Sequence, residues 1–220
     1  MRPKTIIYGI GRQAELMHYL FTHDSPQEVA AFCVDAAYLP PSPAGLRGLP
    51  IVAFEDLSQR YPPSAYQLHI AVGQPKARQR LFEAAKALGY SFTSYISSKA
   101  SVWPDLVLGE HVLIDQSSII HPLVTVGDNT FLTGPTIGHH NVIGSHILLS
   151  TATLGGNAQI GHGTFIGMGA VVNENLRIGQ HNIIGSGAII TRSTNDGAVY
   201  TARAAEKRLV DARRVALFRR

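Results

Sequence analysis

The sequence predicts a small α/β domain followed by a parallel β-helix. From Ile96 to Ile190 an aliphatic residue returns every six positions, apart from steps of five at Leu132–Ile137 and Ile143–Leu148, with small residues or glycine between. A period of six is neither helical nor a simple strand alternation; it is typical of a β-helix, whose short strands form flat faces around a stacked aliphatic core. Residues 1–95 instead alternate strand-like and helical segments, which predicts a parallel sheet covered by helices.

The elements of the first domain can be placed from their apolar runs and their turn residues. Proline opens the last helix at Pro75 and glycine ends it at Gly89. We expect strands at 4–8, 29–35, 66–72 and 91–95, and helices at 12–21, 54–60 and 76–88.

Length, composition and cysteine content exclude several classes of protein. With 220 residues, of which 45% are hydrophobic, the chain can form two ordered domains. The single cysteine, Cys33, lies in an apolar run; it excludes an internal disulfide and is expected to be a buried strand thiol. The apolar stretch 5–10 is too short for a signal peptide or a membrane span. We therefore expect a cytoplasmic protein with no membrane partner.

The net charge of +4 arises in the C-terminal tail, residues 201–220. The basic residues of this tail are Arg203, Lys207, Arg208, Arg213, Arg214, Arg219 and Arg220. With Glu206 and Asp211 subtracted, the tail has a net charge of +5, so the rest of the chain has a net charge near −1. This disfavours nucleic-acid binding, which needs a basic face within the fold. We expect a helix over 202–220, either simply solvated or contributing cations that hold an anionic cofactor such as coenzyme A.

A glycine turn follows the first expected strand. Gly9 and Gly11 separate this strand from a helix, and Ala14 follows three residues later. Such a turn lets a phosphate approach the backbone and the free amides of the helix N-terminus. Asp35, at the end of the second strand, can accept hydrogen bonds from a ribose or a base. The turn fits a nucleotide-sugar site, with a dinucleotide site and a purely structural turn as alternatives.

Two histidines fall beneath two glycines in the predicted β-helix. Three repeats complete one coil of about 18 residues, so residues one coil apart stack. One face is expected to contain Ile120, Ile137, Leu154 and Val172. His139 and His140 then lie below Gly155 and Gly156. A neutral imidazole can accept a proton from an attacking amine or hydroxyl, and bare glycine backbone admits a thioester arm, so this corner is suited to acyl transfer.

The other histidines of the repeats have plainer interpretations. His111, His146 and His181 share another corner and are expected to be exposed polar side chains. His121 and His162 are left unassigned. Imidazoles from neighbouring coils can also share a zinc ion, which is an alternative role for such histidines, but no metal ligand is predicted.

Several short motifs follow one another along the chain in a specific order. They are Tyr8-Gly9-Ile10-Gly11, Val34-Asp35, Gly48-Leu49-Pro50-Ile51, Ile70-Ala71-Val72-Gly73 with Arg78, Ile137-Gly138-His139, Leu154-Gly155-Gly156-Asn157 and Ile184-Gly185-Ser186-Gly187-Ala188. Over nearly its whole length the chain resembles the nucleotide-sugar acetyltransferases that include bacillosamine N-acetyltransferase, perosamine N-acetyltransferase and the sialic acid O-acetyltransferase-like proteins. The resemblance implies a Rossmann-like nucleotide-sugar-binding domain at 1–95, a left-handed β-helix at 96–200 and a helical tail at 201–220.

The resemblance also implies an activity and a set of site residues. It implies a homotrimer with active sites between neighbouring β-helices, acetyl-coenzyme A as donor, and an amino sugar on a nucleotide carrier as acceptor. His139 matches the general base and, with His140, forms the expected catalytic pair. The residues implied to contact the cofactor are Gly156, Met168, Ser186 and Gly187. The residues implied to hold the nucleotide sugar are Gly9, Gly11, Arg12, Asp35 and Gly73.

The chain departs from the family pattern near the expected base. His140 stands where the family usually has Glu or Asp, Leu148 stands near a common cofactor-contacting histidine, and Thr133 replaces a frequent Asn. The closing Gly-X-Pro-Ala-Lys motif has become 201–205. The alternatives to sugar N-acetylation are therefore O-acylation, transfer of a longer acyl chain, and a non-catalytic nucleotide-sugar-binding subunit.

Overall fold

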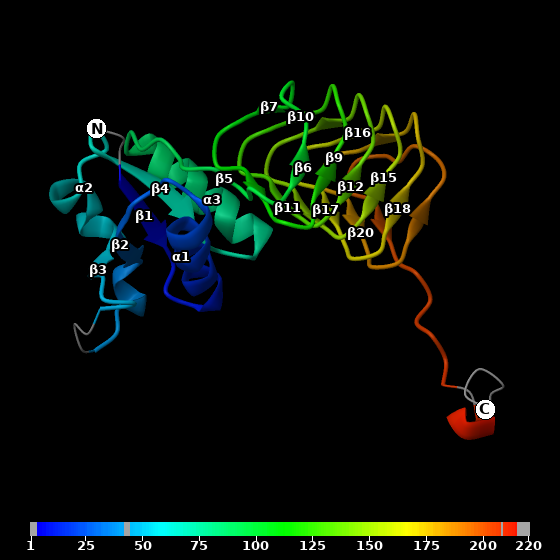
Figure 1. Cartoon of the computed structure of the whole chain (residues 1–220), viewed down its shortest axis with the longest axis horizontal. Helices are drawn as coiled ribbons and strands as arrows, with labels where there is room; N and C mark the ends of the chain where they lie inside the picture. The colour runs from blue at the N-terminus through cyan, green and yellow to red at the C-terminus, as the bar shows by residue number, and fades with distance from the viewer. Residues whose placement is uncertain (1–3, 42–44, 208, 215–220) are drawn as a thin grey trace.

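The computed structural model describes residues 4–41, 45–207 and 209–214. The protein consists of an α/β part and a long triangular prism, with the α/β part at one end of the prism (Figure 1). Beyond the prism the chain runs away from both parts as an extended segment. Among the residues that the structure describes, no helix combines the length and the apolar character that a bilayer crossing requires.

The α/β part is a parallel four-stranded sheet in the order β3-β2-β1-β4. Its strands are β1 (Lys4–Tyr8), β2 (Val29–Val34), β3 (Ile51–Ala53) and β4 (Tyr66–Ile70). Its helices are α1 (Arg12–Asp24), α2 (Leu57–Arg60) and α3 (Pro75–Ala87), with 3-10 turns η1 (Ala36–Tyr38) and η2 (Phe54–Asp56). Helices α2 and α3 pack on one face of the sheet and α1 on the other, which explains why consecutive strand residues are buried.

The sequence predicts these elements well, with two exceptions: it misses β3, and it predicts a strand at 91–95. Helix α3 starts as expected: Pro75 occupies its first turn and the Gln74 side chain accepts a hydrogen bond from the backbone of Ala77. The expected strand at 91–95 is wrong, since Phe92 forms only an isolated bridge with the sheet. The backbone N–H of Tyr95 instead donates to the prism, so this segment is the crossing between the two parts.

The prism has three flat faces of short parallel strands. The first face contains β5 (Tyr95–Ile96), β8 (Leu113–Ile114), β11 (Phe131–Thr133), β14 (Leu148–Ser150), β17 (Phe165–Ile166), β20 (Ile183–Ile184) and β22 (Val199–Tyr200). The second face contains β6 (Ser101–Val102), β9 (Ile119–Ile120), β12 (Thr136–Ile137), β15 (Thr153–Leu154), β18 (Val171–Val172) and β21 (Ile189–Ile190). The third face contains β7 (Val107–Leu108), β10 (Thr125–Val126), β13 (Val142–Ile143), β16 (Gln159–Ile160) and β19 (Arg177–Ile178).

The predicted aliphatic repeat forms the prism core, with one correction. From Ile114 to Ile190 the repeated side chains are buried in one continuous cluster. At the tenth position the core residue is Leu149, which pairs with Leu132 one coil below, and not the predicted Leu148. The second five-residue step therefore ends at Leu154, so both short steps fall at the corner between the first and second faces.

The two parts share a hydrophobic core. One cluster joins Ile7, Phe21 and Phe32 of the α/β part to Leu113 and Phe131 of the first prism face. Burying these large side chains stabilises the folded chain by about 25 cal/mol for each Å² of apolar surface removed from water. The junction is therefore part of the fold rather than a flexible linker.

Arg78 of α3 is a fully buried cation within this junction. Its Nη2 donates to the Ile147 carbonyl at 3.0 Å, its Nε donates to Asn129 Oδ1 at 3.2 Å, and its Nη1 lies 3.4 Å from the Gly73 carbonyl. The guanidinium also lies 4.0 Å from the ring centre of Phe131. Burial lowers the pKa of Arg78 to about 10, so it remains charged at neutral pH. Its donors tie the loop before α3 to two coils of the prism.

Two of the histidines expected to be exposed are buried at the junction instead. Ile70 N–H donates to His111 Nε2 at 2.8 Å, so this nitrogen carries a lone pair and His111 Nδ1 donates to Asn129 Oδ1 at 2.8 Å. The amide of Asn129 donates in turn to His146 Nδ1 at 2.6 Å. Only His181 of the three is exposed. The error arises because β4 and α3 cover this corner, and a repeat pattern alone does not indicate which corner another domain will cover.

Burial makes these histidines resist protonation. It lowers the pKa of His111 well below its ordinary value, and it lowers the pKa values of His69 and His146 to about 4. His69 is fully buried and its Nδ1 lies 3.0 Å from the Thr93 carbonyl. The folded junction therefore needs neutral imidazoles.

The predicted C-terminal helix is wrong for the described part of the tail. Residues 201–207 have no regular structure and are exposed, and the only helical turn among the described tail residues is η3 (Ala212–Arg214). An isolated helix of this length is marginal in water without a packing surface, and here the tail leaves the prism (Figure 1). Arg208, Arg219, Arg220 and the side chain of Arg213 lie outside the described residues, so the expected role of the tail cations in holding coenzyme A stays a prediction.

The junction histidines predict a loss of stability in mild acid. Unfolded histidines take up protons below about pH 6.5, whereas His69 and His146 in the folded protein do so only near pH 4. The unfolded state then binds more protons, so the free energy of unfolding falls as the pH drops through this window. We expect a lower urea midpoint at pH 5 than at pH 7, and a smaller drop in a His146→Gln variant. An unchanged or higher midpoint at pH 5 contradicts this account.

Candidate active site

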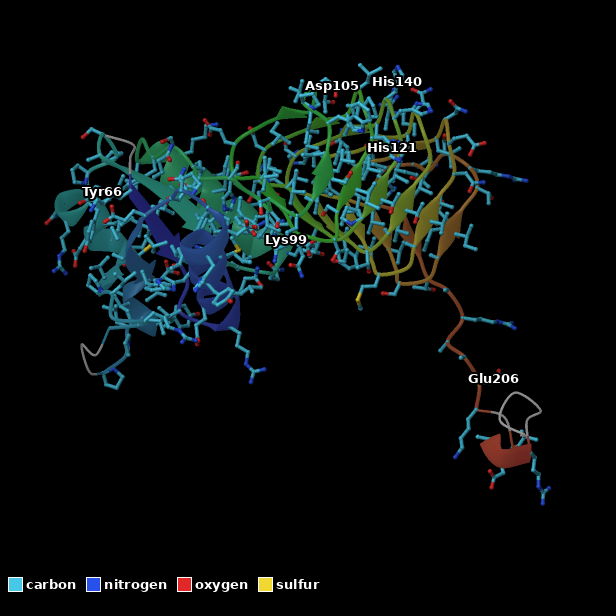
Figure 2. The ribbon with its side chains drawn as sticks, in the orientation of Figure 1. Tyr66, Lys99, Asp105, His121, His140 and Glu206 are labelled. Atoms are coloured by element: carbon cyan, nitrogen blue, oxygen red, sulfur yellow. The ribbon has the colours of Figure 1, made fainter. Side chains whose placement is uncertain are left out.

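The two histidines predicted to be catalytic lie together at the corner between the second and third faces. This corner joins β12 to β13, and both side chains are exposed. His139 Nδ1 and His140 Nδ1 are 2.9 Å apart, with the ring planes at 89°. His140 has a φ of 59°, and this left-handed backbone turns the chain sharply between the two faces. Figure 2 shows His140 at the outer edge of the prism, with His121 and Asp105 on earlier coils.

Gly156 lies against the ring of His139, as the stacking of coils predicts. A Cβ at position 156 would lie only 2.8 to 3.2 Å from three atoms of the His139 imidazole. The Asn157 N–H donates to the His139 carbonyl at 2.7 Å, which fixes the two coils relative to each other. No hydrogen bond within the described residues uses the Gly156 N–H. The corner thus presents an imidazole beside an unpaired backbone donor.

Asn141 holds the backbone beneath this corner. It is fully buried, and its amide nitrogen donates to the carbonyls of Gly138 and Gly155 at 2.8 Å each. These bonds link the coil that carries the histidines to the coil that carries Gly156. The sequence analysis did not single out Asn141; its place three residues after Gly138, at the end of a corner, is the only signal that the sequence offers.

The arrangement can support acyl transfer. An exposed imidazole with one nitrogen held by a neighbouring ring can accept a proton at its other nitrogen. An unpaired backbone N–H nearby can stabilise a developing oxyanion on an acyl carbon. Both groups lie at one corner, where the missing side chain of Gly156 leaves room for the His139 ring.

The other residues predicted to contact the cofactor lie at a different corner of the same chain. Met168, Ser186 and Gly187 are exposed at the corner between the first and second faces. They stack on one another, since the Gly187 N–H donates to the Met168 carbonyl at 2.9 Å. Within one protomer the second face separates them from His139, so the structure does not bring the predicted cofactor residues together in a single site.

The residues predicted to hold a nucleotide sugar meet at one edge of the α/β sheet. Gly9 follows β1, Asp35 follows β2 and Gly73 follows β4, and the carboxyl ends of parallel strands share an edge. Gly9 has a φ of 120°, and a Cβ there would lie 3.2 Å from the Ala71 carbonyl. Gly11 and Arg12 are exposed, and Gly11 caps α1 without a side chain, which leaves the first helical amides open.

Asp35 is partly engaged within the protein. The Tyr8 hydroxyl donates to Asp35 Oδ1 at 2.5 Å, and an Arg80 nitrogen lies 3.9 Å from Oδ2. Burial and this carboxylate raise the pKa of Tyr8, so the phenol keeps its proton and remains a donor. Among the described residues, Asp35 Oδ2 has no hydrogen-bond partner, and it can accept a hydrogen bond from a ligand.

A further cavity, which the sequence analysis missed, lies where α3 faces the prism. It has a volume of about 740 Å³ and is lined by Lys76, His146, Phe165 and Ile183, among others. The start of α3 forms one wall, and the first face of the prism, with its corner to the third face, forms the other. No sequence signal could place it, because it exists only where the two parts meet.

Within the described ranges, no three or more His, Cys, Asp or Glu side chains converge as a metal site. The zinc alternative therefore has no ligand set among these residues. Cys33 is fully buried, as predicted, and burial raises the pKa of its thiol.

Comparison with known proteins reveals what this arrangement is similar to. Residues 157–192 match the model of the bacterial transferase hexapeptide family (six repeats). A histidine-to-asparagine variant of perosamine N-acetyltransferase from Caulobacter crescentus, solved in complex with CoA and GDP-perosamine, is 26% identical and has a TM-score of 0.79 over 90% of this chain and 93% of that chain. The sequence-based resemblance to the sugar N-acetyltransferases is confirmed.

Two more distant structures share the fold. The acetyltransferase domain of PglB from Neisseria gonorrhoeae FA1090 is 22% identical, with a TM-score of 0.78 over 90% of this chain and 96% of that chain. WeeI from Acinetobacter baumannii AYE is also 22% identical, with a TM-score of 0.71 over the same shares. The predicted fold class, a Rossmann-like parallel domain followed by a left-handed hexapeptide β-helix, is confirmed.

The two neighbouring glycines of this corner predict opposite defects. A Cβ at Gly156 would meet only the exposed ring of His139, whereas a Cβ at Gly155 would overlap the backbone of Glu174 on the next coil. We expect Gly156→Ala to keep the melting temperature within a few degrees and to lower acyl transfer about tenfold or more by displacing the imidazole. Gly155→Ala should lower the melting temperature markedly, because the backbone of a stacked coil cannot move aside.

Thermal unfolding and transfer rates of both variants check this pair. A Gly156→Ala protein as active as the wild type contradicts the placement of the site at this corner. Equal melting temperatures for the two variants contradict the distinction between them.

Proposed function

We propose that the protein transfers the acetyl group of acetyl-coenzyme A to the amino group of a nucleotide-linked deoxyamino sugar. The observation that carries this proposal is the corner where the exposed His139 imidazole lies against Gly156, whose backbone N–H has no acceptor among the described residues. Such acetylated sugars serve surface polysaccharide or glycan synthesis, and we assign the reaction to the cytoplasm.

In the proposed reaction His139 acts as the general base. The sugar amine attacks the thioester carbonyl, and a new C–N bond forms. As it does so, the free ring nitrogen of His139 accepts a proton from the amine. The Gly156 N–H donates to the oxyanion of the tetrahedral intermediate. The C–S bond then breaks, coenzyme A leaves as a thiolate, and the proton held by the imidazole can neutralise it.

The donor is supported by a relative of similar architecture. The perosamine N-acetyltransferase structures from Caulobacter crescentus contain CoA together with GDP-perosamine. We propose that acetyl-coenzyme A lies along the prism here, with its thioester at Gly156 and its arm against Met168, Ser186 and Gly187.

The acceptor is supported by the edge of the α/β sheet. Gly9, Gly11 and the open amides at the start of α1 suit a diphosphate, and the free oxygen of Asp35 suits a ribose or base. Arg12 and Gly73 border the same edge. The relative's GDP-perosamine is a ligand of the corresponding chemical class.

A homotrimer is proposed to complete the site. Within one chain Met168 and Ser186 are at a different corner from His139, so a site containing all three needs the corner of a second copy. The second face also leaves Ile119 and Ile189 exposed, at 45% and 67%, which gives such a copy an apolar surface to cover.

The variant His139→Asn tests the proposed base. Removal of a general base lowers kcat by about two to four orders of magnitude, while binding of acetyl-coenzyme A and of the nucleotide sugar should stay within a few-fold. The matched control is His23→Asn on the remote surface of α1, which should retain wild-type turnover. Release of free thiol from acetyl-coenzyme A, followed with a panel of nucleotide amino sugars, provides the rate.

The same assays separate the proposal from its alternatives. Unchanged turnover in His139→Asn refutes the role of this residue. A product whose mass shows an ester or a longer acyl group assigns O-acylation or another donor. A wild-type protein that binds nucleotide sugars in calorimetry but not acetyl-coenzyme A is a binding subunit, and the proposed enzyme activity is then wrong.

A further inference from the structure

We infer that His140 is a positioning residue that selects which ring nitrogen of His139 is free to act as the base. The inference rests on the proposed function of His139 and assigns a specific role to its neighbour. The observation behind it is the 2.9 Å contact between the two Nδ1 atoms, at a corner where the His140 side chain has no other hydrogen-bond partner among the described residues.

A contact between two ring nitrogens allows only a single hydrogen between them. If His139 Nδ1 donates to His140 Nδ1, then His139 Nε2 carries a lone pair and can act as the base. If His140 Nδ1 donates instead, the hydrogen of His139 is on Nε2, and the same ring cannot accept a proton there. The pair therefore has one competent and one incompetent neutral arrangement.

The competent arrangement becomes stronger as the reaction proceeds. When His139 Nε2 accepts the substrate proton, the ring becomes a cation whose Nδ1–H still donates to neutral His140. A hydrogen bond from a charged donor is shorter and roughly twice as strong as a neutral one. His140 thus stabilises the protonated base, and it does so without touching the reacting atoms.

A proton taken up before the substrate binds has the opposite effect. If the neutral pair gains one proton, the hydrogen bond between the rings is kept. His139 then has no free nitrogen that can accept the substrate proton, whichever ring carries the charge. The other titratable side chains along this corner are His121 and Asp105 on earlier coils and Glu174 on a later coil.

The backbone at position 140 permits a clean set of variants. Its φ of 59° suits Gly, Asn and Asp, so none of these substitutions strains the corner. His140→Gly removes the acceptor, His140→Asn supplies a neutral oxygen that does not titrate, and His140→Asp supplies a charged one.

We expect distinct kinetics from the three variants. His140→Gly should lower kcat by about tenfold to a hundredfold, with the KM values for both substrates changed little. His140→Asn should recover most of the lost rate. His140→Asp should recover it as well and move the acid limb of kcat/KM to higher pH, because a carboxylate stabilises the protonated ring. A purely structural role for position 140 predicts no such shift of the acid limb.

Nitrogen-15 NMR of histidine-labelled protein provides a readout that does not depend on activity. In the wild type at neutral pH, the His139 signals, identified by their loss in His139→Asn, should report hydrogen on Nδ1 and a bare Nε2. In His140→Gly the hydrogen should move to Nε2 in most molecules. The inference is overturned if His139 has the same tautomer in both proteins, or if His140→Gly has wild-type turnover and pH profile.

The outcome is distinguishable from failure of the proposed function. If the wild type transfers no acetyl group to any nucleotide amino sugar, the proposed function fails, while the tautomer measurement still decides the geometry. If the wild type is active and His139→Asn is not, the kinetics of the His140 variants decide the role of His140 alone.

Discussion

The stacking of one coil directly on the next is the constraint on which the rest of this structure depends. Parallel pairing at a separation of 17 residues, as between Thr136 and Thr153, fixes the height of every corner residue above the one below. This register puts Gly156 over His139, where no side chain fits beside the ring. The same register spaces the buried aliphatic side chains that hold the prism together, so a change in the core repeat would also misalign the proposed site.

The junction between the two parts sets the other half of the arrangement. Arg78 has no carboxylate partner among the described residues, and its hydrogen bonds go to carbonyl and amide oxygens of the α3 loop and of the prism. A buried cation that loses such partners is costly, so the loop that contains Gly73 is held in one position relative to the first face. The sheet edge that contains Gly9, Asp35 and Gly73 is thereby held in one position relative to the prism that contains His139.

The sequence predicts those features that follow from local or periodic rules. The six-residue repeat predicts the faces, the core and the neighbourhood of His139 and Gly156, and the motifs indicate the resemblance to the sugar N-acetyltransferases. Prediction from the sequence fails where distant segments determine which side chains are buried. His111 and His146 are buried because α3 and β4 cover their corner. The core residue is Leu149 rather than Leu148, and the sequence does not distinguish the two because both are leucine and the short step lies at a corner. The tail has helix-forming residues, but its residues 201–207 are exposed rather than packed against the prism.

The location of the thioester tests the central claim most directly. A crystal structure of the wild-type protein with a non-hydrolysable acetyl-coenzyme A analogue should place the carbonyl oxygen about 3 Å from the Gly156 nitrogen, with the open nitrogen of His139 facing the side from which an amine attacks. The analogue's acyl carbonyl at a corner without His139, or a His139 ring turned away from it, would contradict the account.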